Sequence, residues 1–313
     1  MQLAESQAMI GQKLDDAMTL ARAGQLDAAE TSLHQILIAA PDHPDALQLL
    51  GMVARSRGDH DAAIALFDRS LAVRPDQSHV LNNLGNSLTD SGRHTEAAQA
   101  YERALALNPG YAEARMNLAL ARLALGQPAS ACDTLQPALG AGPNRARAWA
   151  ILGRALGDMK QGARAIDAWR TALRLRSGHL PWLHNLAVAL RLTGRAREAL
   201  PIFRECAARS PHEAKIHYNL GHCLQDLGQI DAATDAYRRA IRLTPADAEI
   251  HDSLSRMLWQ HGRVHAHVQS YRDALVDHPD DPGLLAGLAN RLTLVGEPQA
   301  AADLLAPAIA RGI

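Results

Sequence analysis

Aromatic residues are scarce in this sequence, so its core must be built mainly from smaller side chains. Phe, Trp and Tyr make up 4% of the 313 residues, whereas apolar residues as a whole make up 47%. Aromatic side chains normally supply much of the buried area in a globular core. We therefore expect a core in which alanine and leucine pack helix against helix.

Cysteine is equally scarce, and its positions do not form a metal-binding pattern. Cys132, Cys206 and Cys223 are odd in number and lack the close spacing of a zinc knuckle. This pattern favours buried thiols that behave as small apolar residues in a reducing compartment. We therefore expect a cytoplasmic protein.

The chain also lacks long apolar runs and an excess of either charge. Its N-terminus has no apolar segment of the secretory type, and no apolar run approaches the length of a membrane-spanning helix. The formal charge of −1 disfavours a general nucleic-acid or anionic-membrane binder. Lysine occurs only at positions 13, 160 and 215, and this bias towards arginine indicates a GC-rich bacterial genome.

A period of 34 residues runs through the sequence and is marked first by proline. Proline disfavours helical conformation in the residue before it, so each position of this grid predicts the end of a helix. Ser177 takes one position of the grid, and prolines take the others: Pro41, Pro75, Pro109, Pro143, Pro211, Pro245 and Pro279.

Further columns repeat in phase with the prolines. Glycine recurs 17 residues after most grid positions, where a first helix is expected to stop and turn. Small residues predict a close helix crossing, and large ones fill the space beside it. The small column is Gly51, Gly85, Ala119, Gly153, Ala187, Gly221, Ser255 and Ala289; the large column is Phe67, Tyr101, Leu135, Trp169, Phe203, Tyr237, Tyr271 and Leu305.

These columns resemble the tetratricopeptide repeat (TPR), whose period is 34 residues. Trp149-x2-Leu152-Gly153 and Ala165-x3-Trp169 are similar to the motif of that family. The resemblance implies an all-α fold, a right-handed α-solenoid of about nine 34-residue helix-turn-helix repeats. We expect an N-terminal tail over residues 1–9 and a single superhelical TPR domain over residues 10–313. Its units would start at residues 10, 44, 78, 112, 146, 180, 214, 248 and 282.

In the TPR family the first helix of each repeat lines a concave face. In the unit that starts at 78, leucines share the core phase, while His79, Asn83, Asn86 and Asp90 lie on another face of the same helix. The charges on this face are mixed along the chain, which favours a peptide partner that carries both signs. The predicted peptide-binding groove contains Asn83, Asn117, Asn185, Asn219, Asn86, Asp90, Arg154, Asp158, His222, Asp226 and Arg256.

Four of these residues, Asn83, Asn117, Asn185 and Asn219, share one column that Ile151 interrupts. Asparagine is unfavourable inside a helix, and its amide can both donate to and accept from the backbone of an extended peptide. The column resembles the asparagine ladder in the repeat arms of O-GlcNAc-transferase-like proteins, which implies a peptide groove. Inheritance of asparagine by repeat duplication is the alternative explanation.

Several histidines could suggest metal chemistry, but their positions favour structural roles. His43-Pro44-Asp45 and His278-Pro279-Asp280 match half of an iron-binding triad, yet both fall at turns between units. His261, His265 and His267 cluster at one turn and could bind a transition metal, although a chain with 15 histidines easily produces such a cluster. Phosphate loops and nucleophile motifs are missing. We expect no enzyme activity, cofactor or metal.

The sequence therefore predicts a protein–protein interaction scaffold, with no nucleic acid or membrane as partner. The alternative is the substrate-recruiting arm of a larger enzyme, either a glycosyltransferase or a 2-oxoglutarate/iron oxygenase. Residues 254–263, with residues 270–275 after them, resemble more loosely the repeat arms that precede bacterial oxygenases of the second kind. An RNA-binding repeat array would need a basic groove. Residues 303–313 form an apolar end, which predicts a homodimer contact or a C-terminal domain that follows.

Overall fold

A computed structural model describes residues 2–140 and 142–312. Within these residues the chain forms 18 α-helices and a short 3-10 helix, η1, and it divides into two compact units, Met1–Gln161 and Gly162–Ile313. The helices of the first unit are α1 (Gln2–Arg22), α2 (Leu26–Ala39), α3 (Pro44–Ser56), α4 (His60–Val73), α5 (Ser78–Asp90), α6 (His94–Leu107), α7 (Ala112–Ala124), α8 (Pro128–Leu135), η1 (Gln136–Ala138) and α9 (Arg145–Asp158).

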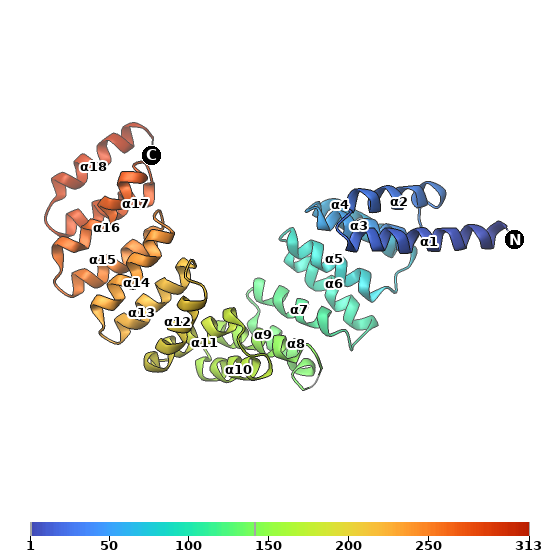
Figure 1. Cartoon of the computed structure of the whole chain (residues 1–313), viewed down its shortest axis with the longest axis horizontal. Helices are drawn as coiled ribbons and strands as arrows, with labels where there is room; N and C mark the ends of the chain where they lie inside the picture. The colour runs from blue at the N-terminus through green and yellow to red at the C-terminus, as the bar shows by residue number, and fades with distance from the viewer. Residues whose placement is uncertain (1, 141, 313) are drawn as a thin grey trace. The chain divides into compact units, whose positions relative to one another are not determined.

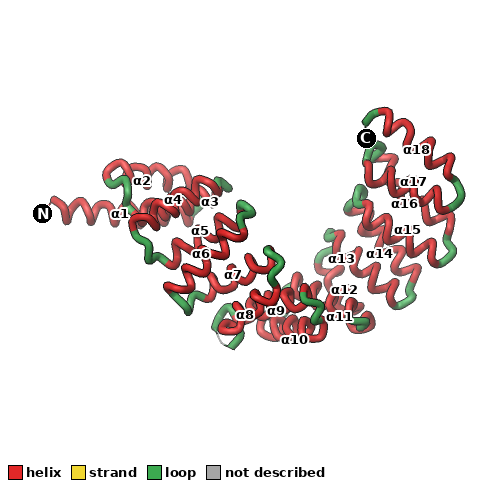
Figure 2. The backbone as a smooth tube through the Cα atoms, turned by 180° about the vertical axis from the view of Figure 1, so that it is seen from behind, coloured by secondary structure: helices red, strands yellow, loops and turns green. Residues whose placement is uncertain are grey.

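The second unit continues the same pattern of antiparallel helix pairs. Within each unit, consecutive helices lie side by side (Figures 1 and 2). The helices of the second unit are α10 (Gly162–Leu175), α11 (Leu180–Leu192), α12 (Ala196–Arg209), α13 (Ala214–Asp226), α14 (Ile230–Leu243), α15 (Ala248–Gln260), α16 (Val264–Asp277), α17 (Pro282–Leu294) and α18 (Pro298–Ala310).

The 34-residue grid matches the observed helices closely. The first helices of seven units begin at the predicted residues 44, 78, 112, 180, 214, 248 and 282, and that of another begins at Arg145 instead of residue 146. This agreement confirms the all-α fold of TPR-like helix pairs.

The predicted close crossing of the two helices in a repeat is confirmed by the contacts of its glycine. A Cβ atom built on Gly85 would lie 2.5 Å from Cε1 of Tyr101, and one built on Gly221 would lie 2.8 Å from Cε1 of Tyr237. Both tyrosines are fully buried. At Gly51, Gly85 and Gly221, a ring of the second helix therefore lies directly on the backbone of the first.

Two elements depart from the sequence prediction. Residues 2–9, which we expected to form a tail, belong to α1, and the sequence has neither proline nor glycine before Gly11 that would stop a helix there. Helix α8 ends at Leu135 and continues as η1, because Pro137 lacks the N–H that an α-helix needs.

The turn after each first helix uses a residue with positive φ. Glycine supplies it in most units, with φ between 69° and 85°, whereas Lys160 takes that position in one unit with a φ of 60°. This left-handed conformation costs a residue with a Cβ atom about 1–2 kcal/mol. Lys160 is exposed, so no packing contact opposes its replacement.

We expect Lys160→Gly to raise the free energy of unfolding by about 1 kcal/mol, since it removes this strain. Urea unfolding followed by circular dichroism would measure the change. The matched control is Gly126→Lys, which places lysine in the same conformation in the preceding turn (φ 69°) and should lower stability by a similar amount. A loss of stability in both variants would contradict the explanation.

Candidate peptide-binding face

The predicted groove residues lie on the first helices of the pairs, on a face distinct from the core. On α5, Leu81, Leu84 and Leu88 are buried, whereas Asn83 and Asn86 are half-buried and His79 and Asp90 are exposed. The helical phase read from the sequence is therefore correct for this helix. The contacts of the individual side chains decide what each can offer to a partner.

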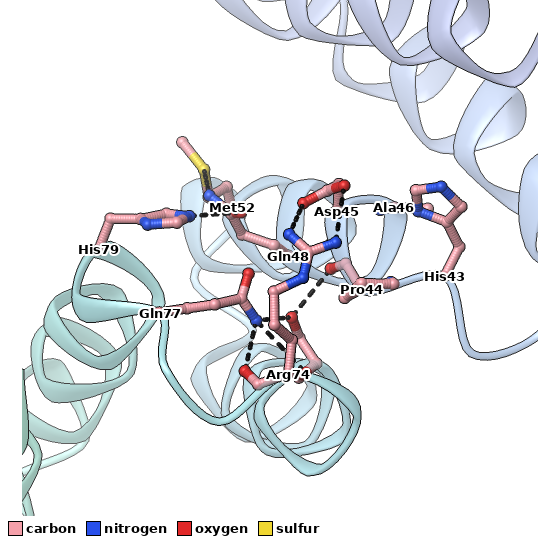
Figure 3. Close-up of polar contacts among 10 residues, drawn as sticks. His43, Pro44, Asp45, Ala46, Gln48, Met52, Arg74, Gln77 and His79 are labelled. Atoms are coloured by element: carbon pink, nitrogen blue, oxygen red, sulfur yellow. Dashed lines mark hydrogen bonds and ion pairs between the residues drawn. The ribbon is translucent and has the colours of Figure 1, made fainter. Parts of the chain in front are cut away.

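Side-chain hydrogen bonds connect the beginning of α5 to the preceding repeat (Figure 3). His79 Nε2 lies 3.0 Å from Oε1 of Gln48 on α3, and the buried Gln77 donates to the carbonyl oxygen of Arg74 at 2.8 Å. Arg74 in turn donates to both carboxylate oxygens of Asp45, at 3.0 and 3.4 Å. Polar side chains at the start of α5 thus contribute to the packing of neighbouring repeats.

Side chains of α5, α6 and α7 form a polar cluster in the first unit. The hydroxyl of the buried Tyr101 donates to Oδ1 of Asn86 at 2.8 Å, and Nδ2 of Asn117 donates to the same oxygen at 3.0 Å. Asn117 also donates to Oδ1 of Asn82 at 3.1 Å. Burial raises the pKa of Tyr101 to about 12, so its hydroxyl stays protonated and remains a donor.

Asn82 is a residue that the sequence analysis missed. It lies in the core phase of α5 beside the predicted Asn83, and its side chain is only 2% exposed. A polar residue in a core phase is a signal in itself, because a buried amide needs a hydrogen-bond partner. That signal could have identified Asn82, but not Asn117 as its partner.

The second unit contains an equivalent cluster 136 residues, or four repeats, further along. The Tyr237 hydroxyl donates to Oε1 of Gln225 at 2.9 Å and lies 2.8 Å from Nδ1 of His222. Burial lowers the pKa of His222, which favours a neutral imidazole whose Nδ1–H donates to the tyrosine oxygen. His222 stands where Asn86 stands in the first unit.

Two predicted acidic residues are already paired with arginine. Arg55 on α3 donates to Asp90 at 2.8 Å, and Arg191 on α11 donates to Asp226 at 3.1 Å. All four side chains keep some exposure, so a partner could still reach the aspartates, but it would compete with an arginine. Arg154, Asp158 and Arg256 are exposed on α9 and α15.

The asparagine column divides into two classes. Asn219 is only 9% exposed, and its Nδ2 makes hydrogen bonds to Nε2 of His184 at 3.1 Å and to the carbonyl oxygen of Lys215 at 3.0 Å. The Nδ2 of Asn117 likewise donates hydrogen bonds to a neighbouring helix, at Asn82 and Asn86 of α5. By contrast, Asn83 is half-buried and Asn185 is exposed. These two amides are the more accessible to a peptide, although the Asn185 side chain also forms a hydrogen bond with His184.

The histidine motifs at the turns have structural roles. Ala46 donates its N–H to Nδ1 of His43 at 3.4 Å, which caps α3, and Asp280 pairs with Arg311 at 2.7 Å. Both observations confirm the interpretation as turn chemistry. In the proposed triple, His261 Nδ1 lies 2.8 Å from the carbonyl oxygen of Met257, while the side chains of His265 and His267 lie outside the described residues.

Two further histidines on first helices contact the backbone. His217 Nε2 lies 3.0 Å from the carbonyl oxygen of Pro211, and His251 Nε2 lies 2.9 Å from that of Pro245. Among the side chains that the structure describes, no group of three His, Cys, Asp or Glu residues is placed to hold a metal ion. None of the described helices is both long and apolar enough to cross a membrane.

The apolar C-terminal end is smaller than the sequence indicated. Leu304 and Leu305 are half-buried and pack against the last core cluster, together with Leu284 and Leu288. Ile309 is 68% exposed. Within residues 303–312, the apolar surface available to a second protein therefore centres on Ile309.

Comparison with known proteins identifies one family over most of the chain. The family model described as cilia and flagella-associated protein 70 C-terminal domain matches residues 3–257. Comparison with curated protein sequences gives no match.

Solved structures of repeat proteins share the fold. A tetratricopeptide repeat protein from Parabacteroides merdae has a TM-score of 0.61 and 16% identity, and the match covers 80% of this chain and 98% of that one. PilF of Pseudomonas aeruginosa has a TM-score of 0.58 and 19% identity, and the match covers 66% of this chain and 94% of that one. A chain of the Cut9–Hcn1 hetero-tetramer of the APC/C has a TM-score of 0.59 and 17% identity. The match covers 90% of this chain and 55% of that one, so this chain spans about half the length of that protein. At these identities the likeness concerns the fold alone.

Proposed function

This chain belongs to the cilia and flagella-associated protein 70 C-terminal domain family, and from that premise we propose that it is a protein-interaction scaffold whose first helices hold an extended segment of a partner. The observation that carries the proposal is the set of polar side chains that these helices expose outside the core. Arg154, Asp158, Asn185 and Arg256 are all exposed there. Stacked helical repeats commonly use such a surface, formed by several repeats together, to bind a partner.

The proposed partner is a polypeptide of mixed charge. The first helices expose both basic and acidic side chains. Two of the acidic residues, Asp90 and Asp226, are each paired with an arginine of a neighbouring helix. The description of the family that matches residues 3–257 names no catalytic activity, and we propose a scaffold for this chain.

We propose a reducing, cytoplasmic environment for this scaffold. The family name refers to cilia and flagella, whereas the arginine bias of the sequence indicated a bacterial genome, and a reducing interior is common to both. Burial raises the pKa of the Cys206 and Cys223 thiols to about 11. Both thiols therefore stay protonated and unreactive at neutral pH.

The test is selection from a random 16-residue peptide library displayed on phage, followed by affinity measurement with the enriched synthetic peptides. The double variant Arg154→Glu/Arg256→Glu reverses one exposed charge on a first helix in each unit. We expect it to weaken binding at least about tenfold, because like charges then oppose parts of the peptide.

The matched control reverses two exposed arginines on second helices, Arg103→Glu/Arg204→Glu. It has the same change of net charge and should bind as the parent does. Equal binding by the two double variants would show that the first helices do not form the binding face.

A further inference from the structure

A pocket lies between α13 and α15 in the second unit, at the edge of the proposed binding face. Its lining includes Glu213, Lys215, Tyr218, Asn219, Asp247 and Glu249, with His212 and Thr244 as further polar residues and Ile250 as an apolar wall. Lys215, Asn219 and Glu249 belong to the same helical stripe as the predicted groove residues. The pocket is therefore a part of the binding face with a defined chemical character.

Asn219 offers the pocket a hydrogen-bond acceptor and nothing else. The side chain is more than nine-tenths buried, and its Nδ2 is engaged by His184 and by the Lys215 carbonyl oxygen. The bonds described for this amide all involve Nδ2, and Asn219 lines the pocket, so its Oδ1 is the atom that a ligand can reach as an acceptor. A ligand group that donates an N–H would satisfy it.

Tyr218 presents an aromatic surface held in a fixed position. Its hydroxyl donates to Oε1 of Glu249 at 2.9 Å and lies 3.2 Å from Oγ of Ser253. Its ring meets the ring of His222 edge-on, with centroids 4.5 Å apart. The face of such a ring attracts cations, and the carboxylate bonded to its hydroxyl adds to that attraction.

The charges around the pocket also favour a cation. Glu213, Asp247 and Glu249 are exposed carboxylates, and none of them forms an ion pair within the described residues. Lys215 opposes them. The Lys215 ammonium also lines the pocket, as a single cation beside three carboxylates. The balance of the formal charges is negative.

We propose that this pocket receives an arginine side chain of the partner polypeptide. A guanidinium is planar, carries five N–H donors and accepts no hydrogen bond, so it can stack on the Tyr218 ring while it donates to Asn219 Oδ1 and to the carboxylate of Glu249 or Asp247. The inference rests on the proposed function, because the arginine arrives as part of a bound segment.

The first unit provides an internal comparison. Four repeats earlier, Asn82 stands in place of Tyr218, Gln77 in place of Glu213 and Tyr111 in place of Asp247, while Glu113 matches Glu249. That position has neither the aromatic platform nor the surplus of carboxylates. The arginine pocket therefore belongs to the second unit, and Glu113 is the natural site for a control substitution.

The experiment is titration of the isotope-labelled full chain with N-acetyl-arginine methylamide, followed by NMR of the side-chain amide signals. We expect saturable shifts of the Asn219 amide signals. The neutral isostere N-acetyl-citrulline methylamide should give no saturable shift. The variant Asp247→Asn/Glu249→Gln keeps side chains that can cap α15 and bond Tyr218, and it should weaken binding of the arginine compound about tenfold or more. Glu113→Gln should leave that binding unchanged.

Equal shifts with the citrulline compound, or unchanged binding by Asp247→Asn/Glu249→Gln, would overturn the proposal. The peptide selection separates this outcome from a failure of the proposed function. Peptides that bind the first helices without a preferred arginine would contradict the pocket and leave the scaffold intact. Enriched peptides that carry arginine at one position, and that the double variant no longer selects, would support both.

Discussion

Gly85→Leu is expected to lower the free energy of unfolding by about 3 kcal/mol, the upper part of the range for overpacked cores. Any Cβ atom at this position would lie 2.5 Å from Cε1 and 2.8 Å from Cδ1 of Tyr101. The ring has no room to move, because it is 1% exposed and its hydroxyl is bonded to Asn86. Urea unfolding of the full chain would measure the loss.

Gly157→Leu is the matched control, since it makes the same change on another first helix of the same unit. Nothing lies within 4 Å of a Cβ built on Gly157, and the residue is exposed. Leucine has the higher helix propensity, so this variant should gain up to about 1 kcal/mol. If both variants had the same stability, the close crossing of α5 and α6 would be refuted.

Replacing the two bonded asparagines should destabilise the protein, whereas replacing the other two should not. Asn117→Ala leaves the buried Oδ1 of Asn82 without its donor, and Asn219→Ala removes the bond to His184. We expect each change to cost about 1–3 kcal/mol. Thermal unfolding of Asn117→Ala/Asn219→Ala, compared with the parent, would measure the effect.

Asn83→Ala/Asn185→Ala is the control for this second prediction. Neither side chain is buried, and alanine has the higher helix propensity, so its stability should equal or exceed that of the parent. The same double variant should weaken peptide binding if the column holds a peptide backbone. Equal melting temperatures for the two asparagine pairs would contradict the division that we describe.

The helix pairs could be predicted from the sequence because each repeat restates the same local rules. Proline at the grid positions, glycine at the turns and small residues at the crossings all depend on backbone geometry that a short segment determines by itself. The exceptions follow from the same rules. Pro137 shortens α8, and Lys160 occupies a turn where glycine would be unstrained.

For the binding face, the sequence could predict which residues lie on the same side of their helices, but not the contacts that their side chains make. A column of asparagines shows that the residues share one side of their helices, but their hydrogen bonds depend on side chains in neighbouring units. Asn117 reaches Asn82 and Asn86, 35 and 31 residues away. The amides of Asn117 and Asn219 connect neighbouring helices, so we expect their replacement by alanine to cost stability, which the phase of the column alone does not indicate.

The contact between glycine and a large ring also constrains the order in which mutations can accumulate in a lineage. In the unit with Gly85 and Tyr101, a larger residue at position 85 is incompatible with the ring, whereas a smaller residue at position 101 would leave a cavity that position 85 could later fill. The unit with Ala119 and Leu135, both fully buried, has the composition that such a history would leave. In a repeat packed like that of Gly85 and Tyr101, the ring must move or shrink before the glycine can be replaced by a larger residue, so drift at this pair has a preferred direction.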